Sequence, residues 1–197
     1  MLYVITSKKL CADNFLTRIE NIARSRPDRL IYREKELSPA DYRTYAYDCR
    51  AICRLYDVPF SINSNIELAR ELCVDLHVPV QMLIDEPSLA REFRVLGASV
   101  HSAQEAKKAE ELGADYVIAG HIFPTECKKG MLPRGLAFLK EVCDRVSIPV
   151  LAVGGISKER INDAYSAGAD GICVMSRFMQ CDMDALEGEL FSFKKTK

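Results

Sequence analysis

The sequence has no large excess of charge of one sign and no long apolar run. Its 27 basic and 28 acidic residues give a net charge of −1. We therefore expect no broad basic surface, and neither nucleic acid nor an anionic membrane as a partner. No apolar run approaches the roughly 18 residues that a membrane helix needs. The first residues have no basic segment and no small-residue cleavage site, so we expect no secretory signal.

Cysteine pairs of the C-x-x-C type are also lacking. The eight cysteines give about half the density of roughly 8–10% that is typical of a disulfide scaffold. We expect reduced thiols used as small apolar residues, which indicates a cytoplasmic protein. The three histidines, at 77, 101 and 121, lack the spacing of metal ligands. The spacing therefore predicts no zinc site, and we expect no cofactor.

No linker or low-complexity stretch interrupts the chain, so we expect a single domain over residues 1–197. Strand-like and helix-like segments alternate from end to end. The expected strands are 2–6, 29–33, 60–63, 74–78, 95–100, 115–120, 149–153 and 171–175. Eight such units predict an α/β fold, a compact (β/α)8 TIM barrel. Because a barrel usually takes about 250 residues, we expect trimmed helices around residues 65–93, including a weak helix over 87–93.

Polar, cationic and glycine residues follow the expected strands. In a β/α barrel, the functional site lies at the carboxyl ends of the strands. The candidate site residues at these ends are Arg33, Lys35, Asn63, Ser99, His121, Thr125, Lys128, Gly154, Gly155, Met175 and Ser176.

A phosphate site is one interpretation of the last two strand ends. Gly154 and Gly155 let backbone N–H groups approach an oxyanion, and Ser176 is expected to cap the final helix. Ser157 is likewise expected to cap the helix that follows Gly155. The alternative is a tight turn followed by ordinary helix caps.

The charged candidates allow similar alternatives. Arg33 and Lys35 lie two residues apart on one side of a strand, which favours an anion between them. His121 is either a general acid and base or a histidine that bonds the loop backbone, and the residues alone leave this open. His77 falls inside a strand and is expected to be structural.

Several segments resemble the thiamine-phosphate synthase/TenI superfamily of small β/α barrels, over nearly the whole chain. Residues 33–35 resemble its R-x-K element, and residues 99–102 resemble its S-x-H-S turn. Residues 120–130 read GHIFPTECKKG, which is similar to the G-H-x-F-x-T-x-C-K-K-G loop of the TenI branch. The resemblance implies the fold already expected from the alternation of segments.

Two departures distinguish the chain from the synthases of that superfamily. The synthases carry carboxylates after strands three and four that hold Mg²⁺ for a diphosphate leaving group. This chain has Ser64 and Met82 at those positions. Without carboxylate oxygens, a hard cation loses its ligands, so the resemblance implies chemistry without a metal.

The resemblance to the TenI branch implies a thiazole tautomerase, a metal-independent isomerase of thiamin biosynthesis. His121 would be its acid and base, and a small-molecule thiazole phosphate its substrate. The other candidates would bind that substrate, with Arg33, Lys35 and Lys128 near its carboxylate. The alternatives are an Mg²⁺-dependent thiamine-phosphate synthase and a non-catalytic binding homologue. Whether Glu34 or Glu126 assists, and whether the chain forms a homo-oligomer, stay open.

Overall fold

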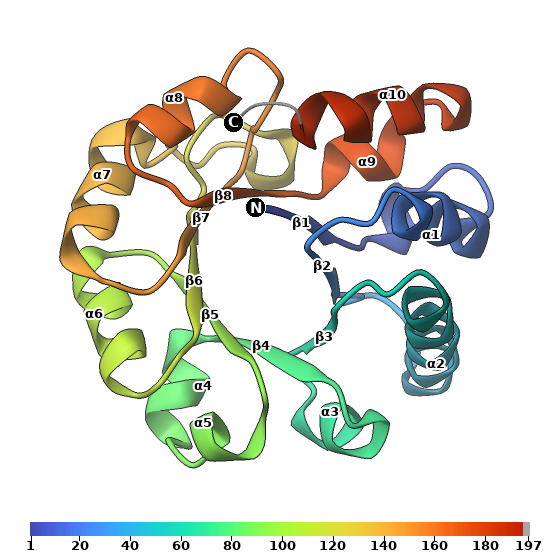
Figure 1. Cartoon of the computed structure of the whole chain (residues 1–197), viewed down its shortest axis with the longest axis horizontal. Coiled ribbons are helices and arrows are strands. Elements are labelled where there is room, and N and C mark those ends of the chain that lie inside the picture. Colours follow the sequence, from blue (N-terminus) through green and yellow to red (C-terminus); the bar gives the residue numbers. More distant parts are fainter. Residues whose placement is uncertain (195–197) are drawn as a thin grey trace. The chain divides into compact units, whose positions relative to one another are not determined.

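A computed structural model describes residues 1–194 of the chain. Its eight strands are parallel neighbours in chain order, from β1 to β8, and the sheet closes into a barrel. Helices connect the strands along the chain (Figure 1). The predicted (β/α)8 barrel is therefore confirmed.

The internal contacts of the chain divide it into two compact units. The β1–β3 unit comprises residues 2–74 and 174–197, and the β4–β8 unit comprises Met1 and residues 75–173. The expectation of a single domain over residues 1–197 stays a prediction. Each unit is described in turn.

The β1–β3 unit contains three parallel strands and six helical segments. These are β1 (Leu2–Ile5), η1 (Lys8–Leu10), α1 (Phe15–Arg24), β2 (Arg29–Tyr32), α2 (Pro39–Leu55), β3 (Phe60–Asn63), α3 (Ile66–Leu72), α9 (Ser176–Gln180) and α10 (Met183–Lys194). All four residues of β2 are buried, as is typical of parallel strands covered on both faces.

The helices α1 and α2 form because their starts are capped and one face of each is apolar. Asn14 caps α1 by accepting a hydrogen bond from the backbone N–H of Thr17. Ser38 caps α2 in the same way, with Pro39 in the first turn. Cys49 and Cys53 are fully buried on α2, so both thiols serve as small apolar residues.

The β4–β8 unit contains five parallel strands in consecutive register. Its elements are β4 (Asp75–Pro79), α4 (Val80–Asp85), α5 (Leu89–Glu92), β5 (Leu96–Val100), α6 (Ala103–Glu111), β6 (Tyr116–Gly120), η2 (Glu126–Lys128), α7 (Gly135–Arg145), β7 (Val150–Val153), α8 (Ile161–Ser166) and β8 (Gly171–Val174). Ser102 caps α6 by accepting a hydrogen bond from the backbone N–H of Glu105.

The helices around residues 65–93 are short, as the sequence predicts. The helices α3, α4 and α5 have only seven, six and four residues. The weak helix predicted over 87–93 corresponds to α5, whereas α4 was not expected. Its residues follow β4 directly, because Pro79 ends the strand and serves as the cap position of α4.

Two predicted helix caps are wrong. Helix α8 begins at Ile161, because residues 157–160 form a separate turn in which the Ser157 hydroxyl donates to the Glu159 carboxylate. Helix α9 begins at Ser176 itself, with Met175 in the cap position and no capping hydrogen bond from a side chain. Neither serine therefore caps a helix.

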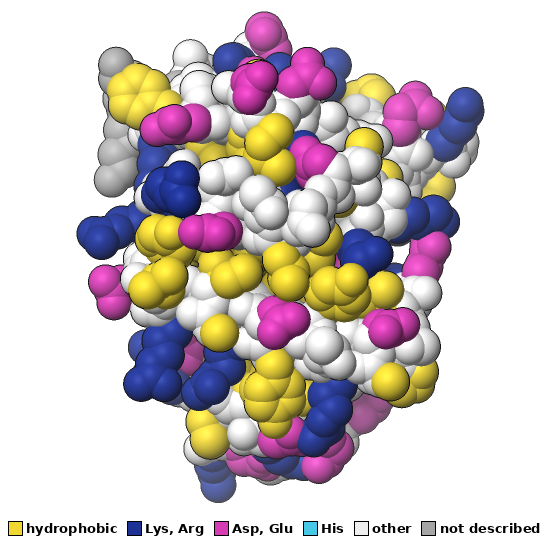
Figure 2. Space-filling view, turned by 90° about the vertical axis from the view of Figure 1, so that its right-hand side faces the viewer, with side chains coloured by type: hydrophobic (Ala, Val, Ile, Leu, Met, Phe, Trp, Pro, Cys, Tyr) yellow, Lys and Arg dark blue, Asp and Glu magenta, His cyan; other side chains and the backbone are white. Residues whose placement is uncertain are grey.

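The face drawn in Figure 2 mixes apolar side chains with charges of both signs. Exposed apolar residues of the β1–β3 unit include Tyr47 and Leu55 on α2 and Phe191 on α10. None of the helices described over residues 1–194 is both long enough and apolar enough to span a membrane.

Candidate functional site

His121 follows β6 in a segment that the backbone holds firmly. The N–H of Ile122 donates to the carbonyl of Val153 (N···O 2.9 Å), and the N–H of Phe123 donates to the carbonyl of Gly154 (3.0 Å). The carbonyl of His121 accepts from the N–H of Arg134 (2.9 Å). The pairing of β6 with β7 thus continues past both strand ends and fixes the backbone of His121.

Gly154 and Gly155 are glycines because this segment lies directly against them. A Cβ atom on Gly154 would come within 2.3 Å of the His121 Cβ. On Gly155 it would come within 2.4 Å of the carbonyl oxygen of Pro124. Both residues also have positive φ angles, 96° and 64°, which glycine adopts without strain. The tight-turn alternative therefore accounts for both glycines by packing, and phosphate binding there stays a prediction.

Arg160, in the turn of residues 157–160, contacts both the segment after β7 and the loop after β6. Its guanidinium donates to the carbonyl of Gly155 (3.1 Å) and lies over the ring of Phe123, 5.1 Å from the centroid. Sequence reasoning missed this residue, because nothing in its neighbourhood along the chain indicates an interaction with residue 123.

The imidazole of His121 keeps one ring nitrogen uncommitted. Its Nε2 atom is buried and has no hydrogen-bond partner among the described residues. An imidazole nitrogen without a protein partner is free to exchange a proton with a ligand. A hydrogen bond from Nε2 to the loop backbone, one form of the alternative interpretation, is therefore not made among the described residues, and the role of His121 stays a prediction.

Thr125 directly precedes the short turn η2 of the same loop, and Lys128 is the last residue of that turn. The N–H of Lys128 donates to the carbonyl of Thr125 (3.0 Å), and the side chain of Lys128 is exposed. Lys129 pairs with Glu126, with 3.8 Å between the amine and the carboxylate, and both side chains are largely exposed. Of the two lysines, Lys128 is therefore the better candidate for an anionic ligand.

Ser99, near the end of β5, is already engaged by the protein. Its hydroxyl lies 2.8 Å from Nε2 of His77, and Nδ1 of His77 lies 3.1 Å from the hydroxyl of Tyr116. His77 is buried, as the sequence predicts, but it also connects to a candidate site residue.

In the β1–β3 unit, Arg33, Lys35 and Asn63 line one open cleft of about 900 Å³. The other lining residues are Glu34, Leu37, Pro39, Tyr42, Arg43, Ser64, Asn65, Ile66, Glu67 and Leu68. Arg33 is half-buried and Lys35 is exposed, so the predicted cation pair is not fully buried. The cleft nevertheless brings three predicted residues together beside the ends of β2 and β3.

Glu34, which lies between Arg33 and Lys35 in the sequence, is buried. Its carboxylate accepts from the backbone N–H of Lys8 (2.7 Å), and the N–H of Arg33 donates to the hydroxyl of Thr6 (3.0 Å). Burial raises the pKa of the Glu34 carboxyl, and hydrogen bonds from Thr6 and Lys8 oppose this shift. Glu34 therefore ties the segment after β1 to the end of β2.

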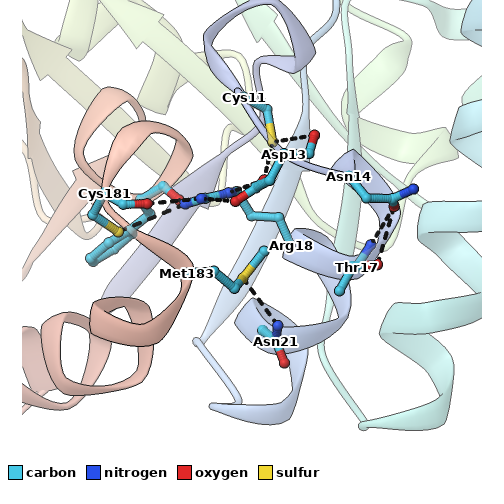
Figure 3. Close-up of polar contacts among 9 residues, drawn as sticks. Cys11, Asp13, Asn14, Thr17, Arg18, Asn21, Cys181 and Met183 are labelled. Atoms are coloured by element: carbon cyan, nitrogen blue, oxygen red, sulfur yellow. Dashed lines mark hydrogen bonds and ion pairs between the residues drawn. The ribbon is translucent and has the colours of Figure 1, made fainter.

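Met175 and Ser176 stand at the start of α9, whose far end is held by a buried arginine (Figure 3). Arg18 is 2% exposed and donates to the carbonyls of Phe178 and Cys181 (both 2.8 Å). Its guanidinium also forms an ion pair with Asp13, which lowers the pKa of that carboxyl to about 2. Asp13 thus serves this ion pair, and the neighbouring Asn14 caps α1.

The residues at the synthase metal positions do not fit Mg²⁺. The Ser64 hydroxyl accepts from the amide of Asn63 (2.7 Å), and Met82 offers only a thioether, whereas Mg²⁺ takes oxygen ligands. Across residues 1–194, no group of three or more His, Cys, Asp or Glu side chains could hold a metal ion.

Comparison with known proteins gives one consistent family. The family described as thiamine monophosphate synthase matches residues 2–178. The thiamine-phosphate synthase of Bacillus licheniformis is 34% identical over 98% of this chain and 89% of its own. That of Clostridium novyi is 34% identical over 92% and 91%.

A solved structure supports the same assignment. The thiamine phosphate pyrophosphorylase from Pyrococcus furiosus superposes with a TM-score of 0.83 at 27% identity, over 98% of this chain and 93% of its own. Both the family match and the relatives extend over most of the chain. The chain therefore belongs to the thiamine monophosphate synthase family.

Proposed function

We propose that this family member is a thiazole tautomerase, which converts a carboxythiazole ethyl phosphate tautomer into its aromatic form. The observation that carries the proposal is His121: its backbone is fixed at the end of β6, while its Nε2 atom has no hydrogen-bond partner among the described residues. The substrate is a small molecule, and the reaction needs no cofactor.

The chemistry is a proton transfer between two carbons of one molecule. The ylidene tautomer loses the proton on the ring carbon that bears the carboxylate, and it gains a proton on the exocyclic carbon. One imidazole performs both steps if it faces that side of the ring, first as base and then as acid. Because the product ring is aromatic, the reaction is downhill.

The remaining candidate residues bind the substrate in our proposal. In our proposal the cations Arg33, Lys35 and Lys128 interact with the substrate carboxylate and stabilise the negative charge that develops as the proton leaves. Hydrogen bonds come from Asn63, Ser99 and Thr125. The backbone at Gly154, Gly155 and Met175 and the hydroxyl of Ser176 bind the phosphate.

The test is turnover of the purified tautomer by His121→Ala. We expect the rate to fall about 10²–10⁴-fold, the usual contribution of an acid–base group, with ligand affinity within a few-fold of wild type. His101→Gln is the matched control, since His101 is largely exposed and pairs with Glu105. Unchanged turnover by His121→Ala would exclude His121 as the proton carrier.

Thiamine-phosphate synthase activity is the second candidate, and the names of the relatives favour it. It predicts coupling of a pyrimidine diphosphate with thiazole phosphate that depends on added Mg²⁺ and stops with a chelator. Ser64 and Met82 support the tautomerase instead, because neither supplies a carboxylate. Tautomer conversion that is insensitive to chelator, without coupling, would separate the two activities.

A non-catalytic binding protein is the third candidate. It predicts that the thiazole phosphate raises the melting temperature while neither reaction proceeds. The same two assays, combined with a thermal shift, distinguish this outcome.

A further inference from the structure

Two aromatic rings meet on one face of the β4–β5–β6 sheet because the strand between them carries no side chain there. His77 pairs in register with Gly97, and Gly97 pairs with Tyr116. A Cβ on Gly97 would lie 2.1 Å from the Tyr116 ring. The rings of His77 and Tyr116 stack with centroids 5.6 Å apart and planes at 24°. The absence of a side chain at Gly97 therefore leaves the space in which the His77 and Tyr116 rings stack.

Ser99 lies two residues beyond Gly97 on the same face of β5. Its hydroxyl is 2.8 Å from Nε2 of His77, and the Tyr116 hydroxyl is 3.1 Å from Nδ1 of that ring. His77 and Tyr116 are each only 2% exposed, whereas Ser99 is half-buried. A buried hydrogen-bonded chain, Tyr116–His77–Ser99, thus ends at a candidate site residue.

A neutral imidazole has one donor nitrogen and one acceptor nitrogen, so only two arrangements satisfy both hydrogen bonds. In the first, Tyr116 donates to Nδ1 and the Nε2–H donates to Ser99, which leaves the serine O–H free to donate elsewhere. In the second, Ser99 donates to Nε2, and the Nδ1–H donates to Tyr116. The serine then offers only lone pairs.

The chemistry of the two hydroxyls favours the first arrangement. A phenol is a better hydrogen-bond donor than an aliphatic alcohol, because its conjugate base is more stable. Burial raises the cost of a mismatched hydrogen bond, so a single arrangement is expected to dominate.

We propose that the Tyr116–His77 pair is a positioning device that holds the Ser99 hydroxyl as a hydrogen-bond donor toward the ligand. Ser99 then selects an acceptor atom, such as a carboxylate or phosphate oxygen, and disfavours a donor such as an amine. The inference rests on the proposed function only in that Ser99 contacts the substrate. The tautomer of His77 is a property of the protein alone.

The first test is therefore independent of activity. With ¹⁵N-labelled histidine, the full chain gives three imidazole spin systems, and His77→Gln assigns the one that disappears. We expect His77 in the Nε2–H tautomer in wild type, with loss of that single form in Tyr116→Phe. The Nδ1–H tautomer in wild type would overturn the proposal, whatever the protein catalyses.

The second test is a double-mutant cycle on the affinity for the carboxythiazole phosphate product, which needs no turnover. We expect Tyr116→Phe to weaken binding about five-fold, the size of one net hydrogen bond. In a Ser99→Ala background the same change should have less than a two-fold effect, since its influence passes through Ser99.

The surface variant Tyr47→Phe is the matched control and should bind like wild type. Additive effects of Tyr116→Phe and Ser99→Ala would show that the two residues act independently, and would overturn the proposal. If the product binds and the cycle is coupled but no tautomer turns over, the proposed function fails while the inference stands.

Discussion

At the scale of single residues, Glu34 is a carboxyl group whose protonation is coupled to folding. Burial raises its pKa above the ordinary value of 4.5, so the folded state holds the proton more tightly than the unfolded state. Its contribution to stability is fully present below about pH 4.5 and is lost as the pH rises through the folded pKa.

We therefore expect Glu34→Gln to flatten part of the decline in the free energy of unfolding above pH 4.5, because an amide does not ionise. Urea unfolding of both proteins between pH 4 and 8 measures this difference. Glu36→Gln, two residues on and 60% exposed, is the control and should follow wild type. Parallel curves for wild type and Glu34→Gln would contradict the coupling.

For His121, the loop motif predicts the position of the residue but not the hydrogen bonding of its side chain. The loop sequence predicts its position at the end of β6, which the structure confirms. That Nε2 has no partner among the described residues depends on which atoms surround the ring, and these come from distant parts of the chain. Ser99 is similar, because its partner His77 lies 22 residues away.

At the scale of elements, the turn after β7 depends on a glycine that has no room for a side chain. Gly154→Ala places a methyl group against the Cβ of His121 at a φ of 96°. We expect a loss of about 1–3 kcal/mol in the free energy of unfolding, the usual cost of such backbone strain, and a fall in turnover because His121 must shift.

The control for this substitution is Gly188→Ala inside α10, where an added Cβ meets nothing within 4 Å. Alanine favours a helix interior over glycine by about 0.5–1 kcal/mol, so this variant should be more stable than wild type. Urea unfolding measures both changes. Equal effects of the two substitutions would mean that the space around Gly154 is not limiting.

At the same scale, the buried Arg18 holds α9 in place. Arg18→Ala removes the donor to the carbonyls of Phe178 and Cys181 and removes the cation that pairs with Asp13. We expect the free energy of unfolding to fall by about 1–3 kcal/mol, the usual cost of leaving a buried carbonyl without its donor, and amide exchange in residues 176–181 to accelerate.

Lys140→Ala removes an exposed ion pair with Asp144 on α7 and serves as the control, with an expected loss of at most about 0.5 kcal/mol. If Arg18→Ala also cost no more than this, the arginine would not hold α9 in place.

At the scale of the whole molecule, the charge balance makes a simple prediction. With 27 basic and 28 acidic residues, and both signs mixed on the face drawn in Figure 2, the protein should not bind a polyanion. We expect no change in the anisotropy of a labelled DNA duplex at physiological salt. Binding that weakens with added salt would indicate a basic surface that the composition does not predict.

The order of helices and strands could be predicted from the sequence, and their ends less well. Apolar runs of four to six residues and periodic helices predict eight alternating units, because these patterns are local. Helix starts were wrong at Ser157 and Ser176, since a serine satisfies either a turn or a cap according to its neighbours in space.

The sequence by itself determined the alternation that builds the barrel, the family, and the strand-end positions of Arg33, Lys35, Ser99 and His121. The tertiary structure decided the rest: that Gly154 and Gly155 pack against the His121 loop, that Glu34 is buried and accepts from the backbone of Lys8, and that His77 reaches Ser99. The reason is physical. Periodicity and turn chemistry act between neighbours along the chain, whereas burial and hydrogen-bond partners depend on residues that only folding brings together.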